Sequence, residues 1–110
     1  MPNTETFAGK SSIAGKIDST GQTSAITVRG SRLLDISIDF DTNSFVGTIV
    51  LQRETRTGAS NVVEWANVEA GYTESTEKVA QSATTRRYRL DCTVATSGTA
   101  EYELTAGNFS

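Results

Sequence analysis

Residues 32–40 alternate strictly between apolar and polar side chains, and no other feature of the sequence constrains the fold as strongly. Because successive side chains of a β-strand point to opposite faces, this alternation predicts a strand with one dry and one wet face. Residues 86–94 show the same alternation. The apolar positions are Leu34, Ile36, Ile38 and Phe40 in the first segment, and Tyr88, Leu90, Cys92 and Val94 in the second. Since β-branched residues are frequent and no helical period of useful length appears, we predict an all-β protein.

Short runs of this kind, separated by turn residues, recur from residue 24 onward. Their spacing and the chain length of 110 residues are typical of one antiparallel β-sandwich of about seven strands, Ig-like or jelly-roll-like in form. Lys78 suits a sheet edge, where a charged side chain discourages pairing with another chain. We therefore assign residues 24–110 to a β-sandwich domain. The predicted strands cover residues 24–28, 32–40, 45–54, 62–68, 77–81, 86–94 and 100–104.

The last two predicted strands would fix their own register if they formed a hairpin. A three-residue loop at 96–98 keeps their apolar faces together, whereas a one-residue slip would turn one of those faces to water. Such a loop has a glycine at its left-handed position, here Gly98. We therefore predict a β-hairpin. Its expected pairs are Val94 with Ala100, Cys92 with Tyr102, and Leu90 with Leu104.

Residues 1–23 differ in composition from the rest of the chain, because Ser, Thr, Gly, Asn and Lys dominate and apolar residues are isolated. Such a segment cannot bury enough surface to offset its ordering entropy alone. We predict an extended polar N-terminal arm over residues 1–23. It is either a disordered leader or an arm that orders against a partner, with Phe7, Ile13 and Ile17 as anchors. No apolar run in the first 30 residues exceeds two, so neither a secretory signal nor a membrane span is expected.

The formal net charge of −3 argues against a general nucleic-acid binder, because affinity for phosphate comes largely from Lys and Arg. Three arginines do cluster, but carboxylates follow on what should be the neighbouring strand surface. We interpret the cluster as one half of a charge-paired sheet face and expect no nucleic-acid partner. The arginines are Arg86, Arg87 and Arg89, and the carboxylates are Asp91, Glu101 and Glu103.

The residue types that carry most catalysis and metal binding are scarce. The chain has no histidine, the commonest general base and metal ligand. Its single cysteine, Cys92, can form neither a paired-cysteine zinc site nor an intramolecular disulfide, and we expect it to be a small buried hydrophobe. Asp39, Asp41 and Asn43 could touch a cation, but a capped β-turn is the favoured interpretation. We therefore expect no catalytic residues, no metal and no cofactor.

The single tryptophan, Trp65, would carry any prediction of carbohydrate binding, because sugars stack on exposed aromatic rings. Tyr72 is the one plausible exposed companion. Trp65 follows Val62 and Val63 closely, and a tryptophan in such a sequence more often fills a sandwich interior. We therefore predict that Trp65 belongs to the core.

Several short motifs have a spacing that is similar to that of a known group of proteins. They are Gly47–Arg53, Trp65, Val68, Tyr72-Thr73, Tyr88-Arg89-Leu90 and Ser97–Ala100. In this spacing the chain resembles small β-sandwich structural proteins of tailed bacteriophages, which occur as head decoration (cement) proteins and as fibre modules. The resemblance covers residues 45–104. The chain departs from the group at residues 57–64, where a longer loop replaces a tight Gly-rich turn and weakens the case for a loop-borne binding site.

The resemblance implies a non-enzymatic virion structural protein, synthesised in the host cytoplasm and located on the capsid exterior. The expected function is that of a capsid decoration protein that binds the major capsid protein through its N-terminal arm. The resemblance also implies a homo-oligomer, with a trimer favoured. The alternative is a tail or fibre module that recognises a host-surface glycan or protein. A third possibility is a small enzyme inhibitor or an Ig-like adhesion domain of bacterial origin.

Overall fold

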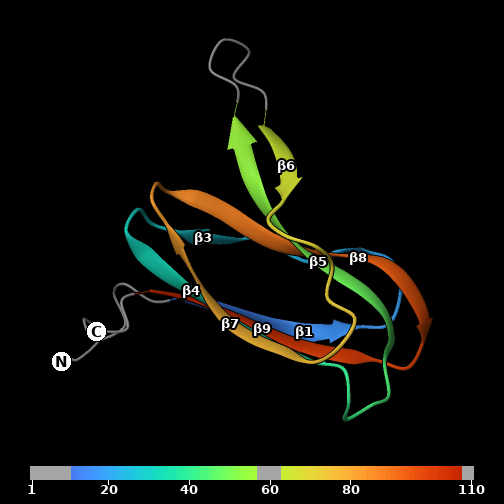
Figure 1. Ribbon diagram of the computed structural model, residues 1–110. Coiled ribbons are helices and arrows are strands. Elements are labelled where there is room, and N and C mark those ends of the chain that lie inside the picture. Colours follow the sequence, from blue (N-terminus) through green and yellow to red (C-terminus); the bar gives the residue numbers. More distant parts are fainter. Residues whose placement is uncertain (1–10, 57–62, 108–110) are drawn as a thin grey trace, which may run out of the picture.

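The computed structural model describes residues 11–56 and 63–107, which form two antiparallel sheets packed face to face (Figure 1). The strands are β1 (Ser11–Ile17), β2 (Gly21–Gln22), β3 (Ile26–Val28), β4 (Arg32–Asp39), β5 (Val46–Arg56), β6 (Val63–Asn67), β7 (Thr76–Ser82), β8 (Arg86–Ser97) and β9 (Ala100–Gly107). The predicted all-β sandwich is confirmed, and the seven predicted strands correspond to β3–β9. In the residues described, no helix is long and apolar enough to cross a membrane.

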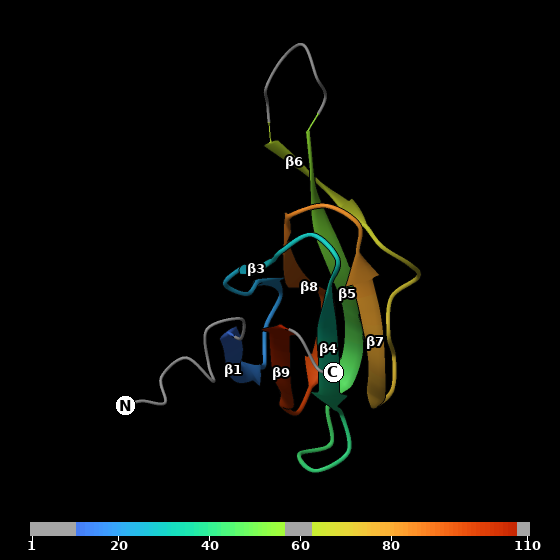
Figure 2. The same ribbon diagram turned by 90° about the vertical axis from the view of Figure 1, so that its left-hand side faces the viewer.

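The two sheets combine strands from distant parts of the chain. Sheet A has the order β1-β9-β4-β7, which runs from left to right in Figure 2. Sheet B has the order β2-β8-β5-β6, and β3 also pairs with β8. β5 and β6 continue beyond the rest of sheet B as a two-stranded ribbon that projects from the sandwich (Figure 1).

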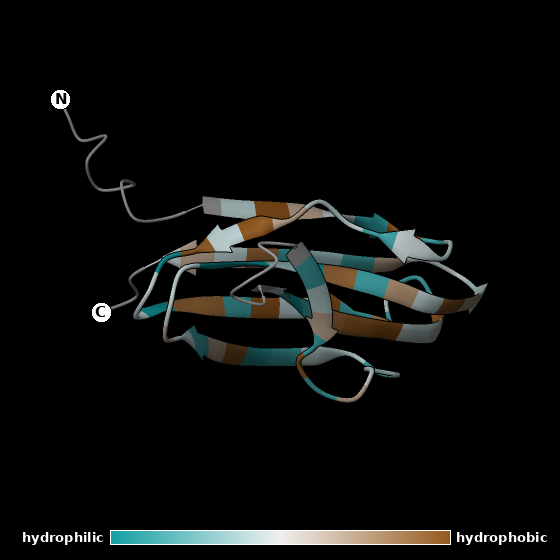
Figure 3. Ribbon diagram, turned by 90° about the horizontal axis from the view of Figure 1, so that it is seen from above, coloured by the Kyte–Doolittle hydropathy of each residue, from teal (hydrophilic) through white to brown (hydrophobic). Residues whose placement is uncertain are grey.

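The hydrophobic core lies between the sheets and follows the predicted alternation. The four apolar side chains of residues 34–40 are each at most 3% exposed. Figure 3 shows the corresponding alternation of hydrophobic and hydrophilic residues along the strands. Further large buried side chains come from both sheets, among them Ile49, Leu51, Tyr88, Leu90 and Leu104. Burial of one face of each sheet is the main stabilising contribution in such a fold.

The prediction of an N-terminal arm is wrong for residues 11–22, because these residues belong to the sandwich. β1 is the edge strand of sheet A, where Ile13 lies opposite Leu104 and Ile17 opposite Ala100. Ile17 is 6% exposed, and Ile13 packs against the core. β2 adds two further residues to sheet B. The domain therefore includes residues well before the predicted boundary at 23/24.

Packing between strands explains why the sequence of β1 does not look like a strand. An added Cβ at Gly15 would lie 3.0 Å from the hydroxyl oxygen of Tyr102, so the tyrosine ring of β9 covers the surface that the glycine leaves open. Only Ile13 and Ile17 contribute large apolar side chains. Phe7, the third predicted anchor, lies outside the described residues.

The predicted hairpin of the last two strands is wrong. β8 pairs with β5 in sheet B, whereas β9 pairs with β1 and β4 in sheet A. The chain crosses from one sheet to the other at Gly98 and Thr99, and Gly98 has the predicted left-handed conformation, with φ +77°. Apart from Val94, parity assigned the dry faces of these two strands correctly. However, two strands that face each other across a core give the same parity as two neighbours in one sheet.

The predicted inward position of Val94 is also wrong, because the side chain is 47% exposed. Cys92 pairs with Ile49 and Val94 pairs with Thr48, so Thr93 is an extra residue on β8. Such a β-bulge reverses the parity of the residues that follow it.

β7 forms the outer edge of sheet A, as predicted from Lys78. Lys78 lies opposite the buried Ile36, and its ammonium group makes an ion pair of 2.5 Å with Glu69. Glu69 also accepts a hydrogen bond from the hydroxyl of Tyr72, which bridges to Ile49 of sheet B. An inward-pointing charge is one way in which natural proteins protect an edge strand. Here the same lysine also links the two sheets along one side.

Candidate functional site

Trp65 lies on the outer face of sheet B, so the prediction that it belongs to the core is wrong. β6 pairs with β5 in a register that places Trp65 directly opposite Glu54. Gln52 and Glu54 alternate with the core residue Leu51 and therefore share the outer face with Trp65. Trp65 is partly exposed. In the described part of the chain β6 pairs with β5 alone, in the ribbon that projects beyond the sandwich (Figure 1).

Two arginines of β8 lie over the indole ring of Trp65. The guanidinium carbon of Arg89 is 4.1 Å from the ring centroid, and that of Arg87 is 5.6 Å from it. The buried Tyr88 separates them in sequence, so both project from the outer face. A guanidinium group over an indole face is attracted by the ring quadrupole and stacks on it, and each contact stabilises by roughly 0.5–2 kcal/mol.

Hydrogen bonds fix both arginines in place. Arg87 donates through Nε and Nη2 to Oε2 of Glu54, at 3.0 and 2.9 Å. The Glu54 side chain is only 4% exposed, and its paired cation offsets the cost of burying a carboxylate. Arg89 donates through Nε to Gln52 Oε1 at 2.8 Å, and Gln52 in turn donates to Asn67 at 3.1 Å. We call this surface the Trp65 patch. It consists of Gln52, Glu54, Trp65, Asn67, Arg87 and Arg89.

Of the three arginines in the predicted charge-paired sheet face, only Arg87 makes an ion pair among the described residues, and its partner is not one of the predicted carboxylates. Arg87 pairs with Glu54 of the neighbouring strand β5. Glu101 and Glu103, the predicted partners, lie on β9 in the other sheet. Asp91 accepts a hydrogen bond of 3.1 Å from Gln22. The difference follows directly from the crossing of the chain between sheets after β8.

The chemistry of the Trp65 patch is suited to binding. The patch offers guanidinium and amide hydrogen-bond donors beside an indole face, and its one carboxylate, Glu54, is paired with Arg87. Tryptophan and arginine are the residue types that contribute most to the energy of protein–protein interfaces. Their side chains are already ordered here, which reduces the entropy lost on binding.

Tyr72 does not form an aromatic platform with Trp65. It is 9% exposed and belongs to the core cluster, whereas Trp65 lies on the outer face. Burial, together with the hydrogen bond to Glu69, raises the pKa of Tyr72 and keeps its hydroxyl protonated. The two aromatic side chains therefore lie on opposite sides of sheet B.

The predicted turn around Asp39 is confirmed. Asp39 Oδ1 accepts hydrogen bonds from the backbone N–H groups of Asp41 and Thr42, at 2.8 and 3.1 Å, and Oδ2 accepts one from the Thr42 hydroxyl. These bonds lower the pKa of Asp39. Asn43 donates to Glu101 at 3.0 Å. Among residues 11–56 and 63–107, no three His, Cys, Asp or Glu side chains form a group that could hold a metal ion.

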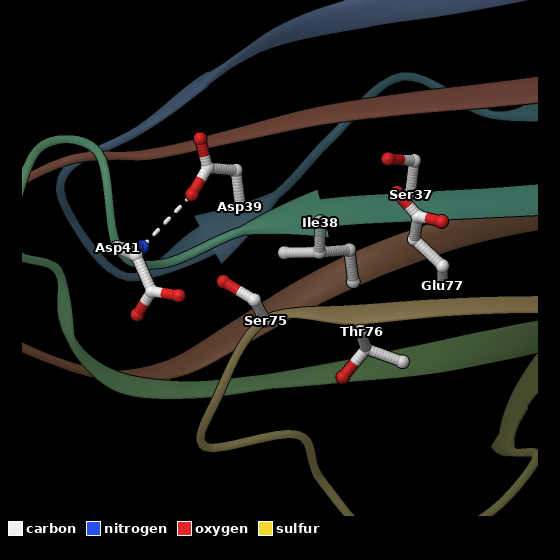
Figure 4. A pocket seen from close by; sticks show the side chains of 7 residues that line it. All are labelled: Ser37, Ile38, Asp39, Asp41, Ser75, Thr76 and Glu77. Carbon is white, nitrogen blue, oxygen red and sulfur yellow. Dashed lines mark hydrogen bonds between the residues drawn. The ribbon is translucent and has the colours of Figure 1, made fainter.

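A shallow groove next to this turn is lined by carboxylates and hydroxyls. Figure 4 shows the side chains of Asp39, Asp41 and Glu77 around it, together with Ser75 and Thr76. The groove lies at the opposite end of the strands from the start of β4 and β8. It is therefore separate from the Trp65 patch.

The three predicted arm residues do not form a site in the structure. Ile13 and Ile17 pack in the sandwich, and Phe7 lies outside the described part of the chain. The Trp65 patch was not predicted, although Trp65, Arg87 and Arg89 were each noted separately in the sequence. Its components come from β5, β6 and β8, and only the strand register brings them together.

Comparisons with family models, with curated proteins and with solved structures found no match to this chain. The function proposed below therefore rests on the resemblance of residues 45–104 and on the geometry of the molecule.

Proposed function

We propose that this protein is a non-enzymatic virion structural protein, a capsid decoration protein that binds the major capsid protein through the Trp65 patch. The observation that carries the proposal is the stacking of Arg89 on Trp65 on an outer sheet face. The resemblance of residues 45–104 to phage structural proteins supports the choice of partner and the location on the capsid exterior.

The position of the patch favours contact with a broad protein surface. It lies on sheet B and on the ribbon of β5 and β6, which projects from the sandwich (Figure 1). Arg87 is already paired with Glu54, so burial of this pair in an interface would leave neither of its two charges uncompensated. Interface centres of this type combine an aromatic anchor with arginine and are surrounded by polar groups.

The homo-oligomer implied by the resemblance, with a trimer favoured, is part of the same proposal, as is synthesis in the host cytoplasm. The segment that could act as an arm is shorter than predicted. Since Ile13 and Ile17 are occupied within the sandwich, an arm contact with the capsid would have to come from residues 1–10, which include Phe7.

The proposal is tested by titrating the purified chain onto empty phage heads and counting bound copies per head. We expect saturable binding by the wild type. Trp65→Ala and Arg89→Ala should each weaken it about 30-fold, because truncation of an interface hot spot costs at least about 2 kcal/mol. Val79→Ala is the matched control, since Val79 is exposed on sheet A, away from the patch. Absence of wild-type binding, or equal binding by Trp65→Ala, would rule the proposal out.

A tail or fibre module that recognises a host-surface glycan or protein is the second candidate. The partial exposure of the Trp65 ring favours it, whereas the burial of Tyr72 removes the second aromatic surface that a sugar platform needs. Binding of the wild-type chain to intact host cells, without binding to heads, would favour this candidate over the first.

A further inference from the structure

The charged side chains of the sandwich are separated along the strand direction. β4 begins at Arg32 and ends at Asp39, and its eight residues span roughly 25 Å. β5 ends with arginines, and β8 begins with them. β9 begins at the other end of the molecule with Ala100 and Glu101. Among the described residues, the arginines of β4, β5 and β8 therefore lie toward the end of the strands where β4 and β8 begin.

Four arginines lie at one end of the sandwich, around the space between the two sheets. We call these four residues the arginine end. Arg29 and Arg32 flank the turn between β3 and β4, where the Arg32 N–H donates to the Arg29 carbonyl at 3.0 Å. This turn contacts the β7–β8 connection through a 2.7 Å hydrogen bond from Ser31 N to the Ser82 carbonyl. The arginine end consists of Arg29, Arg32, Arg53 and Arg86.

The strand register places the other two members at the same end. Arg86 lies opposite Val28, and Arg53 lies opposite Tyr88. Within residues 11–56 and 63–107, none of the four makes an ion pair, and Arg29 and Arg53 are exposed. The arginine end is distinct from the Trp65 patch, whose arginines project from the outer face of sheet B.

Carboxylates gather at the opposite end of the strands, which we call the acidic end. The loops at 18–20, 41–44 and 98–99 meet there, at the right of Figure 1. Asp39 lies directly opposite Glu101, and Asp41 and Glu77 line the groove next to it (Figure 4). Lys16, opposite Glu101, is the one cation among the described residues of this end. The acidic end consists of Asp18, Asp39, Asp41, Glu74, Glu77 and Glu101.

Each end keeps a surplus of one sign of charge: the four arginines make no ion pair among the described residues, and Lys16 is the one cation at the acidic end. Like charges gathered at one end repel one another, so a partner of opposite charge would relieve the repulsion at each end. A polyanion would satisfy only the arginine end and would meet a chain with net charge −3. A second copy of the chain satisfies both ends at once, because each end finds its complement on the neighbouring molecule.

We propose that copies of this protein associate head to tail, with the arginine end of one copy docked on the acidic end of the next. Such a contact is heterologous, so it gives a ring if the rotation between copies closes and a filament if it does not. The contact gives a geometry to the homo-oligomer of the proposed function and in that respect rests on it. It uses neither the Trp65 patch nor a capsid, so self-association can fail while binding to heads succeeds, and the reverse.

The test is sedimentation velocity of the full chain at 20 mM and at 1 M NaCl, with two charge-reversal variants. We expect the wild type to associate at low salt and to dissociate at high salt, because the Debye length falls to about 3 Å at 1 M. Arg29→Glu with Arg53→Glu, and Asp41→Lys with Glu77→Lys, should each weaken association at least tenfold. An equimolar mixture of the two variants should associate again, because the reversed ends complement each other.

Two controls separate this interface from a general effect of net charge. The variant Asp35→Lys with Glu64→Lys changes the net charge as much as the acidic-end variant, at exposed positions outside that end, and should still associate. Circular dichroism of every variant checks that the sandwich is folded. The proposal is overturned if the wild type stays monomeric at 20 mM NaCl, if both reversals leave association unchanged, or if the mixture stays monomeric. It is also overturned if the arginine end binds a single-stranded oligonucleotide while the wild type stays monomeric.

Discussion

Gly98 shows at the scale of one residue how the chain changes sheets. Its φ of +77° is strained for any residue with a side chain, and an added Cβ would lie 2.1 Å from the carbonyl oxygen of Ser44. We expect Gly98→Ala to lower the free energy of unfolding by about 2–4 kcal/mol, because backbone strain and a clash act together. Urea denaturation followed by circular dichroism measures it.

Gly21 supplies the matched control. It also has a positive φ, of +139°, but an added Cβ would meet no atom within 4 Å. Gly21→Ala should therefore cost clearly less than Gly98→Ala, since strain acts there without a clash. Equal losses at the two positions would contradict the close approach of Gly98 to the 41–44 turn.

Cys92 gives a second prediction at this scale. The thiol is buried, and desolvation raises its pKa, so little thiolate is present at pH 8. We expect Ellman's reagent to label the folded protein at least about 100-fold more slowly than the urea-unfolded chain, because reaction requires opening of the core. A native labelling rate within tenfold of the unfolded rate would place Cys92 outside the core.

At the residue scale, the sequence predicted dry and wet faces but not every position on them. Period-two alternation fixed the buried set of residues 34–40, which the structure confirms. It failed at Val94, because the extra residue Thr93 cannot be recognised from composition. It also failed at Trp65, since a large apolar ring can be stabilised by arginine stacking on an outer face as well as by burial.

Of all the strands, β1 differs most from the prediction, which assigned its residues to an N-terminal arm. An N-terminal arm would tolerate truncation of its side chains without loss of stability. Because Ile17 is buried in the core between the sheets, Ile17→Ala should instead lower the free energy of unfolding by about 2–4 kcal/mol. Ser12→Ala, at an exposed position of the same strand, should change it by less than about 0.5 kcal/mol.

Chemical denaturation of the two variants measures this difference. A stability for Ile17→Ala equal to that of the wild type would restore the arm hypothesis for residues 11–17. A loss that is equally large for Ser12→Ala would instead indicate a general sensitivity of the strand to substitution.

Strand positions were predictable, whereas strand neighbours were not. Alternation and turn residues located β3–β9 because these signals are local. Pairing depends on which apolar faces meet, and parity allows two strands to be neighbours in a sheet or partners across the core. β8 and β9 are partners across the core. β1 was missed because a segment with two large apolar residues has too weak a pattern without the covering ring of Tyr102.

For the whole molecule, the candidate surfaces depend on topology and could be predicted only in part. The cluster of arginines at 86–89 was visible in the sequence, as was the single tryptophan. Their contact was not, because it requires β6, β5 and β8 to be adjacent in a particular register. The separation of arginines from carboxylates along the strands likewise appears only when the direction of each strand is known.

The central claim is that the outer face of sheet B, through the Trp65 patch, contacts the major capsid protein. The most direct measurement places a photo-crosslinking amino acid at position 65, and in a parallel sample at position 79, before the chain is mixed with empty heads and irradiated. We predict a covalent adduct with the major capsid protein from position 65 and none from position 79. An adduct from position 79 alone, or from neither position, would contradict the claim.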